Sequence, residues 1–396
     1  MVIECGTTSC RVGLAGEASP RLIFPPVLGK PKPPGAHGAE MLIGDAALEN
    51  RATHAMKHPI DHGIPFDMDG VERLWRHSYA AGVEQPPDAQ PVLLGEAPGN
   101  PRSCREQLVQ LMFEKLSVPA LALVPTPVLV LAAHGLRTGL VIESGEQLTH
   151  IVCVYEGHVL RHTLPRPFFY RGMGGGRAGG FVTDRLLSLL AAERGVAATT
   201  VKERGVVQRL KEEHAYAAPS SEAGALDAVA RGSPQSDEPP AELVCPLLEA
   251  IDGHTSVTLG AERHQCVERL FSPAAEELDL SQGDGIVAGL HEAAWQAVQS
   301  CPVELRQIMC EHVVLSGGNA MLSGFAERMR RELGALARAH DLEVRLVPRP
   351  EAQPDWRLDA WVGASTTAAD AAFEARCITR AEYDEHGPAV VHRKCF

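Results

Sequence analysis

The same short pattern occurs twice in this chain: an apolar stretch, a turn of small residues and a second apolar stretch. The first copy occupies residues 1–16 with its turn at 6–9, and the second occupies residues 140–157 with its turn at 143–146. Apolar runs on either side of such a turn predict a β-hairpin. Because the pattern recurs, we expect an internally duplicated fold with one small-residue turn in each half.

The length and charge of the chain limit the classes of protein to consider. A chain of 396 residues is long for a single hydrophobic core and is typical of two lobes. Its 37 basic and 50 acidic residues give a net charge of −13. This argues against a general nucleic-acid binder, because phosphate contact needs a basic face. The longest apolar run, residues 119–133, is too short to span a bilayer, so we expect no membrane association.

The ten cysteines are scattered along the chain and contain no Cys-x-x-Cys pair. Their spacing therefore predicts no zinc site. The first residues do not have the basic and apolar regions of a signal peptide. We therefore expect no disulfide framework, and we expect a soluble protein in a reducing, intracellular compartment.

Hydrophobic periodicity predicts the main elements. Apolar residues at helical spacing predict helices at 71–79, 102–116, 181–194, 324–338 and 361–376. Short apolar runs predict strands at 92–94 and 148–155, and a strand that begins at Val313 and enters a Gly-Gly turn. Stretches rich in Pro, Gly, Ser or acidic residues predict loops at 30–38, 171–180, 219–240 and 276–285. A dinucleotide-binding role for 171–180 is the weaker interpretation, because that stretch follows no clear strand and lacks a partner acid.

Four stretches carry a resemblance to one family. They are residues 378–396 (ITRAEYDEHGPAVVHRKCF), 91–102 (PVLLGEAPGNPR), 56–64 (MKHPIDHGI) and 314–319 (VLSGGN). Each resembles a segment of actin, the first of them nearly residue for residue, and all four occur in the family's order. The sequence therefore resembles a divergent actin or actin-related protein along its whole length, with insertions at 165–180, 219–240 and 273–285.

The resemblance implies an α/β fold of two lobes, built from duplicated ribonuclease-H-like domains around a nucleotide cleft. The first lobe would comprise residues 1–133 and 358–396, with a smaller subdomain at about 25–60. The second would comprise residues 134–357, with a smaller subdomain at about 175–270. The family binds ATP or ADP with Mg²⁺ or Ca²⁺, so the resemblance implies the same cofactors here.

The two small-residue turns match the phosphate loops of the family. Small side chains let backbone N–H groups approach phosphates. The resemblance assigns phosphate contact to Gly6, Thr7, Thr8, Ser9, Arg11, Ser144, Gly145 and Glu146. It assigns water-mediated cation binding to Glu4 and Glu143, where the family has Asp; the longer side chains must alter the geometry around the cation. Taken alone, these glycines and glutamates favour the ordinary interpretation, in which the glycines form hairpin turns and the glutamates are solvated charges.

The adenosine side of the nucleotide is better matched. The resemblance assigns it to Lys211, Glu212, Gly317, Gly318, Met321 and Arg357. Actin positions its attacking water with a Gln, and this chain has Thr126 at the matching place. His150 matches a second water-positioning residue and His62 a sensor histidine, although both could be ordinary packed histidines. Because loss of a positioning group slows catalysis, we expect hydrolysis to be very slow or absent.

The surfaces that the family uses to polymerise are also altered. The loop at 31–43, which inserts into a neighbour in actin filaments, is shortened and has a small, polar tip. The receiving groove, lined by large aliphatic residues in the family, has Thr366, Thr367, Asp370, Ala372 and Arg376, with Ala132 nearby. Charged residues oppose burial of an apolar partner, so we expect no ordinary homo-filaments. The alternative is that this helix simply packs with small residues.

These observations predict an actin-related structural subunit of a larger cytoskeletal, axonemal or similar complex, with other protein subunits as its partners. A polymerising actin paralogue with slow ATPase activity is one alternative, and a nuclear subunit of a chromatin-remodelling complex is another. A sugar or metabolite kinase on the same fold is disfavoured by the actin-like C-terminal segment. We expect a cytoplasmic, cytoskeletal location that could include a cilium or flagellum, with the nucleus as the alternative.

Overall fold

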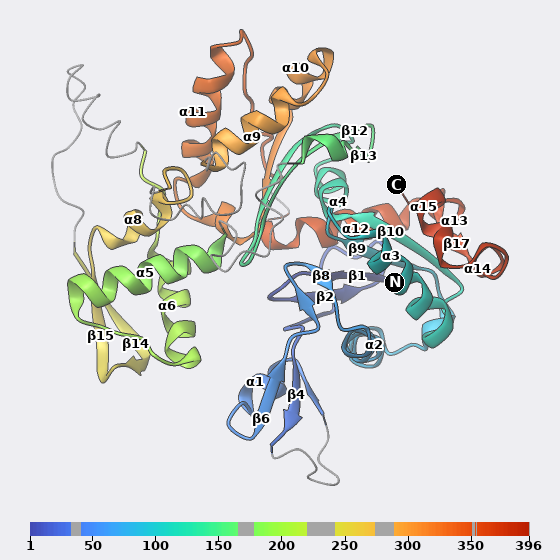
Figure 1. Ribbon diagram of the computed structural model, residues 1–396, viewed down its shortest axis with the longest axis horizontal. Helices are drawn as coiled ribbons and strands as arrows, with labels where there is room; N and C mark the ends of the chain where they lie inside the picture. The colour runs from blue at the N-terminus through green and yellow to red at the C-terminus, as the bar shows by residue number, and fades with distance from the viewer. Residues whose placement is uncertain are drawn as a thin grey trace. The chain divides into compact units, whose positions relative to one another are not determined.

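The structure is a computed structural model that describes residues 1–32, 41–164, 178–219, 242–273, 289–350, 353 and 355–395 (Figure 1). The chain divides into two compact units. Unit 1 comprises Met1–Val141, Val154–Leu160 and Arg349–Phe396, and unit 2 comprises Ile142–Cys153 and Arg161–Pro348. The lobe boundaries expected at 133/134 and 357/358 stay a prediction. Most of the loops expected from composition, at 33–38, 171–177, 220–240 and 276–285, lie outside the described residues.

Unit 1 is built on a six-stranded mixed sheet. Its strand order is β17 (Ile378–Thr379), β10 (Ala120–Pro125), β9 (Val92–Glu96), β1 (Val2–Cys5), β2 (Cys10–Gly13) and β3 (Leu22–Phe24). The expected hairpin of residues 1–16 is present, because β1 and β2 pair antiparallel. Strands β9 and β10 run parallel to β1, so the three strands end at the same edge of the sheet.

The remaining strands of unit 1 form two small sheets. The larger has the order β5 (Leu42–Ile43), β4 (Leu28–Pro31) and β6 (His54–Lys57), and the smaller pairs β7 (Ile60–Asp61) with β8 (Ile64–Pro65). The helices of this unit are α1 (Asp45–Glu49), α2 (Met68–His77), α3 (Arg102–Gln110), α4 (Thr126–Ala133), α12 (Asp359–Ala369), α13 (Phe373–Arg376), α14 (Arg380–His386) and α15 (Val391–Lys394). Two of them, α2 and α3, continue into π-helical turns at Ser78–Val83 and Leu111–Lys115.

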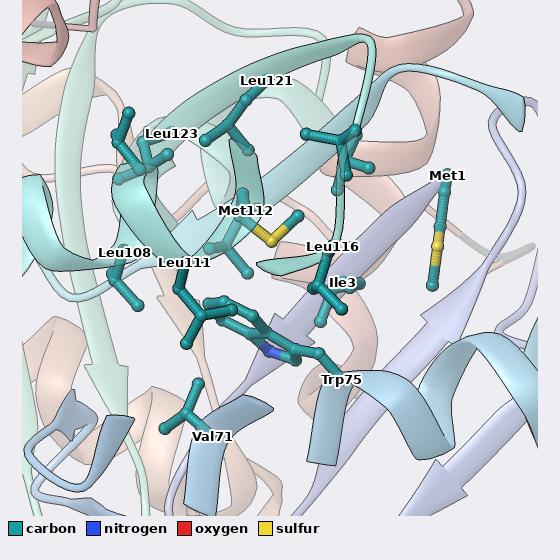
Figure 2. Packing of buried hydrophobic residues seen from close by; sticks show 14 of the residues in the cluster. Met1, Ile3, Val71, Trp75, Leu108, Leu111, Met112, Leu116, Leu121 and Leu123 are labelled. Atoms are coloured by element: carbon teal, nitrogen blue, oxygen red, sulfur yellow. The ribbon is translucent and has the colours of Figure 1, made fainter. Parts of the chain in front are cut away.

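The core of unit 1 follows from the spacing of its apolar residues. Val71, Leu74 and Trp75 are buried on α2 at the i, i+3 and i+4 positions of one helix face. Figure 2 shows Trp75 packed among Leu111 and Met112, which the π-helical turn after α3 supplies. Each large apolar side chain that is fully buried stabilises the fold by about 1.5–3 kcal/mol.

Helices α4 and α12 of unit 1 approach each other unusually closely. Gly363 lies on α12 at the contact, and a Cβ atom built there would be only 1.7 Å from the carbonyl oxygen of Leu129 on α4. Only glycine allows two helix backbones to come this near. The close contact explains why the helix predicted at 361–376 is rich in small residues.

Unit 2 contains helices and a β-hairpin. Its helices are α5 (Gly179–Arg194), α6 (Val201–His214), α8 (Glu262–Glu268), α9 (Leu290–Gln299), α10 (Val303–Glu311) and α11 (Phe325–Arg338). The hairpin pairs β14 (Leu243–Ile251) with β15 (His254–Leu259) and lies beside α5 and α6 (Figure 1). Helix α6 begins at a capping box, in which Thr200 and Glu203 satisfy each other's backbone N–H groups.

A second sheet has four strands, in the order β13 (His158–Val159), β12 (Thr149–Tyr155), β11 (Gly139–Ser144) and β16 (Val313–Ser316). Strands β11 and β12 form the second predicted strand–turn–strand pattern, and each has residues in both units. After β16 the chain enters a 3₁₀ turn at Gly318–Met321, as the Gly-Gly sequence predicts.

The expected end of one helix is wrong. The helix expected at 361–376 ends at Ala369, because Asp370 leaves the helical conformation and its carboxylate accepts a hydrogen bond from the Ala372 N–H at 2.9 Å. The sequence also predicts no disulfide framework, and in the described residues Cys5 and Cys10 form one local disulfide. These two residues are direct partners in the β1–β2 hairpin, so a five-residue spacing in the sequence places them side by side.

Candidate functional site

Loop one, residues 4–11, joins β1 to β2 in unit 1. The Gly6 N–H donates to the Ser9 carbonyl at 2.9 Å and closes a tight turn. Thr8 is exposed at its tip, whereas Gly6, Thr7 and Ser9 are half-buried. The disulfide between Cys5 and Cys10 joins the two ends of the turn. Loop one is therefore a short, cross-linked turn of small residues.

The charged residues of loop one are paired with each other. Glu4 and Arg11 are opposite partners in the hairpin, and Arg11 Nη1 donates to Glu4 Oε2. The exposed fraction of these side chains is only 6% for Glu4 and 12% for Arg11. A buried charge is stable only when it is paired and hydrogen-bonded, so the two side chains depend on one another.

The positive charge of Arg11 also acts on the pKa of a second acid of unit 1, Asp355. Burial acts to raise the pKa of Asp355, but hydrogen bonds from Arg357 and the charges of Arg357 and Arg11 outweigh it, and the pKa is lowered. The Arg357 guanidinium holds both Asp355 carboxylate oxygens, at 2.9 and 2.8 Å. Arg357 is exposed and lies on the turn Trp356–Leu358. It belongs to unit 1, whereas the other residues assigned to the adenosine side belong to unit 2.

Loop two, residues 143–147, closes as loop one does. The Gly145 N–H donates to the Leu148 carbonyl at 2.9 Å, again from a glycine to the residue three positions later. The Ser144 hydroxyl shares a hydrogen bond with the Thr149 hydroxyl at 2.9 Å. Asn319 Nδ2 donates to both Ser144 Oγ and the Gly145 carbonyl, each at 2.9 Å. The duplication expected from the sequence therefore extends to the hydrogen bonding of the two loops.

Gly317 brings the turn after β16 directly onto loop two. Its φ is +85°, a backbone conformation that favours glycine. A Cβ atom at this position would lie 2.4 Å from the Ser144 carbonyl oxygen, whereas one at Gly318 would meet nothing within 4 Å. The adjacent Met321 side chain is 46% exposed, which suits a residue that stacks on a ligand.

Glu146 of loop two is held by cations from α6. Lys211 Nζ lies 3.4 Å from Glu146 Oε2 and donates to the Gly179 carbonyl at 3.1 Å. Arg204 Nη1 lies 3.9 Å from Glu146 Oε1. The exposed fraction of the Lys211 side chain is only 3%, so this ammonium depends on its partners. Its neighbour Glu212 is exposed and accepts from Gln208 on the same helix.

The start of α5 also packs on loop two, which the sequence did not predict. The Gly179 N–H donates to the Gly145 carbonyl at 2.8 Å, and the Gly180 N–H donates to the Glu146 carbonyl at 2.7 Å. These two glycines were expected to end a flexible insertion, and that expectation is wrong. The signal was a Gly-Gly pair directly before a helical run, which is typical of a helix that starts against a loop backbone. Arg204 gave no comparable signal, whereas Asn319 is the last residue of the 314–319 stretch that carries the family resemblance.

The residues expected to act on water occupy defined positions. Thr126 is the first residue of α4 and is 8% exposed. His150 lies on β12, and burial lowers the pKa of its imidazole to about 4, so the ring is neutral at physiological pH. His62 has a φ of 51°, and its Nδ1 lies 2.8 Å from Asp61 Oδ1. The catalytic roles assigned to Thr126 and His150 stay predictions.

Glu4, one of the two carboxylates assigned to the cation, does not fit a water-shelled divalent cation well. Such a cation needs carboxylate oxygens that accept from its waters in octahedral geometry. Glu4 and Glu146 instead face Arg11 and Lys211. Glu143 is half-buried at the end of β11. In the described ranges, no group of three or more His, Cys, Asp or Glu side chains is arranged to hold a metal ion.

Comparison with known protein families identifies the family of this chain. In the part of the chain that the structure describes, no helix is long and apolar enough to cross a membrane. A family model described as actin matches residues 1–396, and the α/β actin-like fold expected from the sequence is thereby confirmed. Because the match covers the full length, and because both small-residue loops recur with the same closure, the chain belongs to the actin family.

Proposed function

We propose that this chain is an actin-related structural subunit of a larger cytoskeletal assembly, and that it binds ATP or ADP as a structural ligand with little or no hydrolysis. Members of its family typically bind adenine nucleotide and are slow ATPases. A ligand that binds only the native state stabilises that state by mass action, so nucleotide matters here without being hydrolysed.

The observation that supports the subunit proposal is the charged surface formed by Asp370 and Arg376, which follow α12 in the sequence. Asp370 and Arg376 form an ion pair at 3.1 Å, and each side chain is 54% exposed. Thr366, four residues before Asp370 in the sequence, is also exposed. Burying such a pair in a contact with a neighbouring copy would cost desolvation free energy that the weak exposed pair does not return. A second copy of this chain is therefore a poor partner for this surface.

The case for slow hydrolysis rests on Thr126. A threonine hydroxyl on a short, branched side chain reaches less far than the amide of glutamine, and Thr126 is fixed at the first turn of α4 between Pro125 and Pro127. A water molecule held less well in line with the reacting phosphate reacts more slowly. The neutral His150 imidazole then remains as the second group assigned to this water.

The decisive experiment is purification of the tagged chain from its native source, with its partners identified and counted by mass spectrometry. We expect a stoichiometric set of dissimilar proteins. Recovery of mainly this chain, or of conventional actin and its regulators, would overturn the subunit proposal. High-speed pelleting of the purified chain in MgCl₂ and KCl gives the complementary result, since we expect it to stay in the supernatant.

A pair of variants tests the surface directly. Asp370→Leu with Arg376→Leu makes the surface apolar, and we expect more protein in the pellet. The matched control is Glu327→Leu with Arg330→Leu, which removes another exposed ion pair, at 2.6 Å, from α11. Equal pelleting of both double variants would show that the position of the charge does not matter.

A further inference from the structure

We propose that Cys5 and Cys10 form a reversible redox site, at which small thiols such as glutathione reduce the disulfide of loop one and the disulfides of those thiols restore it. The inference goes beyond the proposed function, because it concerns loop one of unit 1 alone and holds whether or not the chain binds nucleotide.

The register of the β1–β2 hairpin brings the two sulfur atoms together. The Gly6 N–H donates to the Ser9 carbonyl, so these two residues are a hydrogen-bonded pair. Hydrogen-bonded and non-hydrogen-bonded pairs alternate along an antiparallel ladder, and side chains lie closer in the second kind. Cys5 and Cys10 are the next partners and therefore form a non-hydrogen-bonded pair. The backbone pairing alone thus makes the two side chains neighbours, before and after the bond forms.

The hairpin has other contacts that keep it closed when the disulfide is reduced. Glu4 and Arg11 form a buried ion pair beside the disulfide. Strand β1 also pairs with β9, and β2 also pairs with β3. The disulfide joins residues only five positions apart, and a cross-link across so short a loop removes little entropy from the unfolded chain. Reduction therefore leaves the fold in place, as a reversible site requires.

The two sulfur atoms differ in access, which sets the order of the reaction. Cys5 is half-buried, whereas Cys10 is fully buried. A thiolate reaches the more accessible sulfur first. It bonds to Cys5 Sγ as a mixed disulfide, the bond to Cys10 breaks, and Cys10 leaves as a thiolate that takes a proton from water. A second small thiolate attacks the small-thiol sulfur, which releases the small disulfide and frees Cys5. Two electrons pass to the protein.

The other cysteines of the chain distinguish this pair from a disulfide framework. All eight are free thiols, and all eight are buried. Free thiols in this number suit a compartment that keeps disulfides reduced. In such a compartment a disulfide with a half-buried sulfur exchanges with the thiol pool. The Cys5–Cys10 bond therefore reports the balance between small thiols and their disulfides.

The test equilibrates the native full-length protein in buffers of different ratios of reduced to oxidised glutathione. Acid quenching, alkylation in denaturant and mass spectrometry then give the fraction of cross-linked Cys5–Cys10. We expect this fraction to follow the ratio and to reach the same value from reduced and from oxidised protein. A pair that stays cross-linked in excess reduced glutathione would be a fixed structural bond and would overturn the inference. A pair that stays reduced in excess oxidised glutathione would overturn it too.

Single variants test the order of attack. In Cys10→Ala we expect oxidised glutathione to leave a mixed disulfide on the half-buried Cys5. In Cys5→Ala the buried Cys10 should remain a free thiol. Equal modification of both variants would show that access does not select Cys5. The measurement on the parent chain needs no substitution, so the inference stays testable if a variant fails to fold.

Hydrogen exchange measures the effect on loop one. We expect the amides of residues 6–9 to exchange on the order of tenfold faster in the reduced protein, because a covalent tie at the base of the turn is lost. The matched control is Cys245→Ala, which removes a free thiol opposite Val257 in the β14–β15 hairpin and should keep this difference. Cys5→Ala with Cys10→Ala should abolish it. Equal exchange in oxidised and reduced parent protein would show that the disulfide does not hold loop one.

Discussion

Thr126 is the single side chain on which the expected loss of hydrolysis depends. We predict that Thr126→Gln raises the rate of phosphate release from ATP at least about tenfold, because a longer amide side chain restores a group that orients water. A phosphate-release assay measures this, with a melting curve to verify that the larger, partly buried residue is tolerated. Thr366→Gln, at an exposed position on α12, is the control. An unchanged rate for Thr126→Gln would mean that another difference limits the reaction.

His150 makes stability depend on pH. Burial lowers the pKa of its imidazole to about 4, whereas an unfolded histidine titrates near 6.5. Between these values the unfolded chain binds the proton and the folded chain does not. The contribution of the neutral His150 ring to the free energy of unfolding is therefore fully present above pH about 6.5, and it is lost as pH falls toward about 4. A pKa shift of this size corresponds to roughly 3 kcal/mol of stability, at about 1.4 kcal/mol for each pKa unit.

The prediction for His150 is that His150→Gln flattens the dependence of the free energy of unfolding on pH between about 4 and 6.5. Urea unfolding at several pH values measures this slope. The control is His254→Gln, at an exposed position in the β14–β15 hairpin. If both variants keep the slope of the parent chain, some other group is responsible for it.

At the scale of elements, the turn after β16 has to lie directly on loop two. We predict that Gly317→Ala costs about 2–4 kcal/mol of stability, because its Cβ would clash with the Ser144 carbonyl and its positive φ is strained for alanine. Gly318→Ala, one residue later with open space around it, should cost less than about 1 kcal/mol. Equilibrium unfolding of both variants gives the comparison, and equal losses would contradict the packing described.

The elements also show how far sequence reasoning reaches. Once the first turn is placed at residues 6–9, the antiparallel ladder makes Glu4 the partner of Arg11 and Cys5 the partner of Cys10. The ion pair and the disulfide could therefore have been predicted from local pattern alone. The neighbours of loop two could not, because Lys211 and Asn319 reach it from 65 and 175 residues away through tertiary packing.

At the scale of the whole molecule, one buried arginine joins distant parts of unit 1. Arg105 on α3 holds Glu96 at 2.8 Å, and its Nη2 donates to the Cys395 carbonyl at 2.7 Å. We predict that Arg105→Met destabilises the protein by about 3–5 kcal/mol, because it leaves Glu96 buried without its cation. Urea unfolding measures the loss, and hydrogen exchange should rise in residues 380–395.

The control for Arg105 is Arg76→Met on α2, which removes an exposed pair with Glu72. We expect it to cost less than about 1 kcal/mol. A small loss for Arg105→Met as well would mean that other contacts, such as those of Tyr383 with Glu114 and His392 with Glu106, suffice to hold the C-terminal segment of the described chain in place.

The π-helical turns that follow α2 and α3 have a consequence for how this chain can vary in length. A π-helical turn accommodates one residue more than an α-helical turn while the helix axis continues. Ser78–Val83 and Leu111–Lys115 are therefore two places where one residue can be deleted and the helix can relax to ordinary geometry. Relatives that are one residue shorter would be expected to differ at these turns.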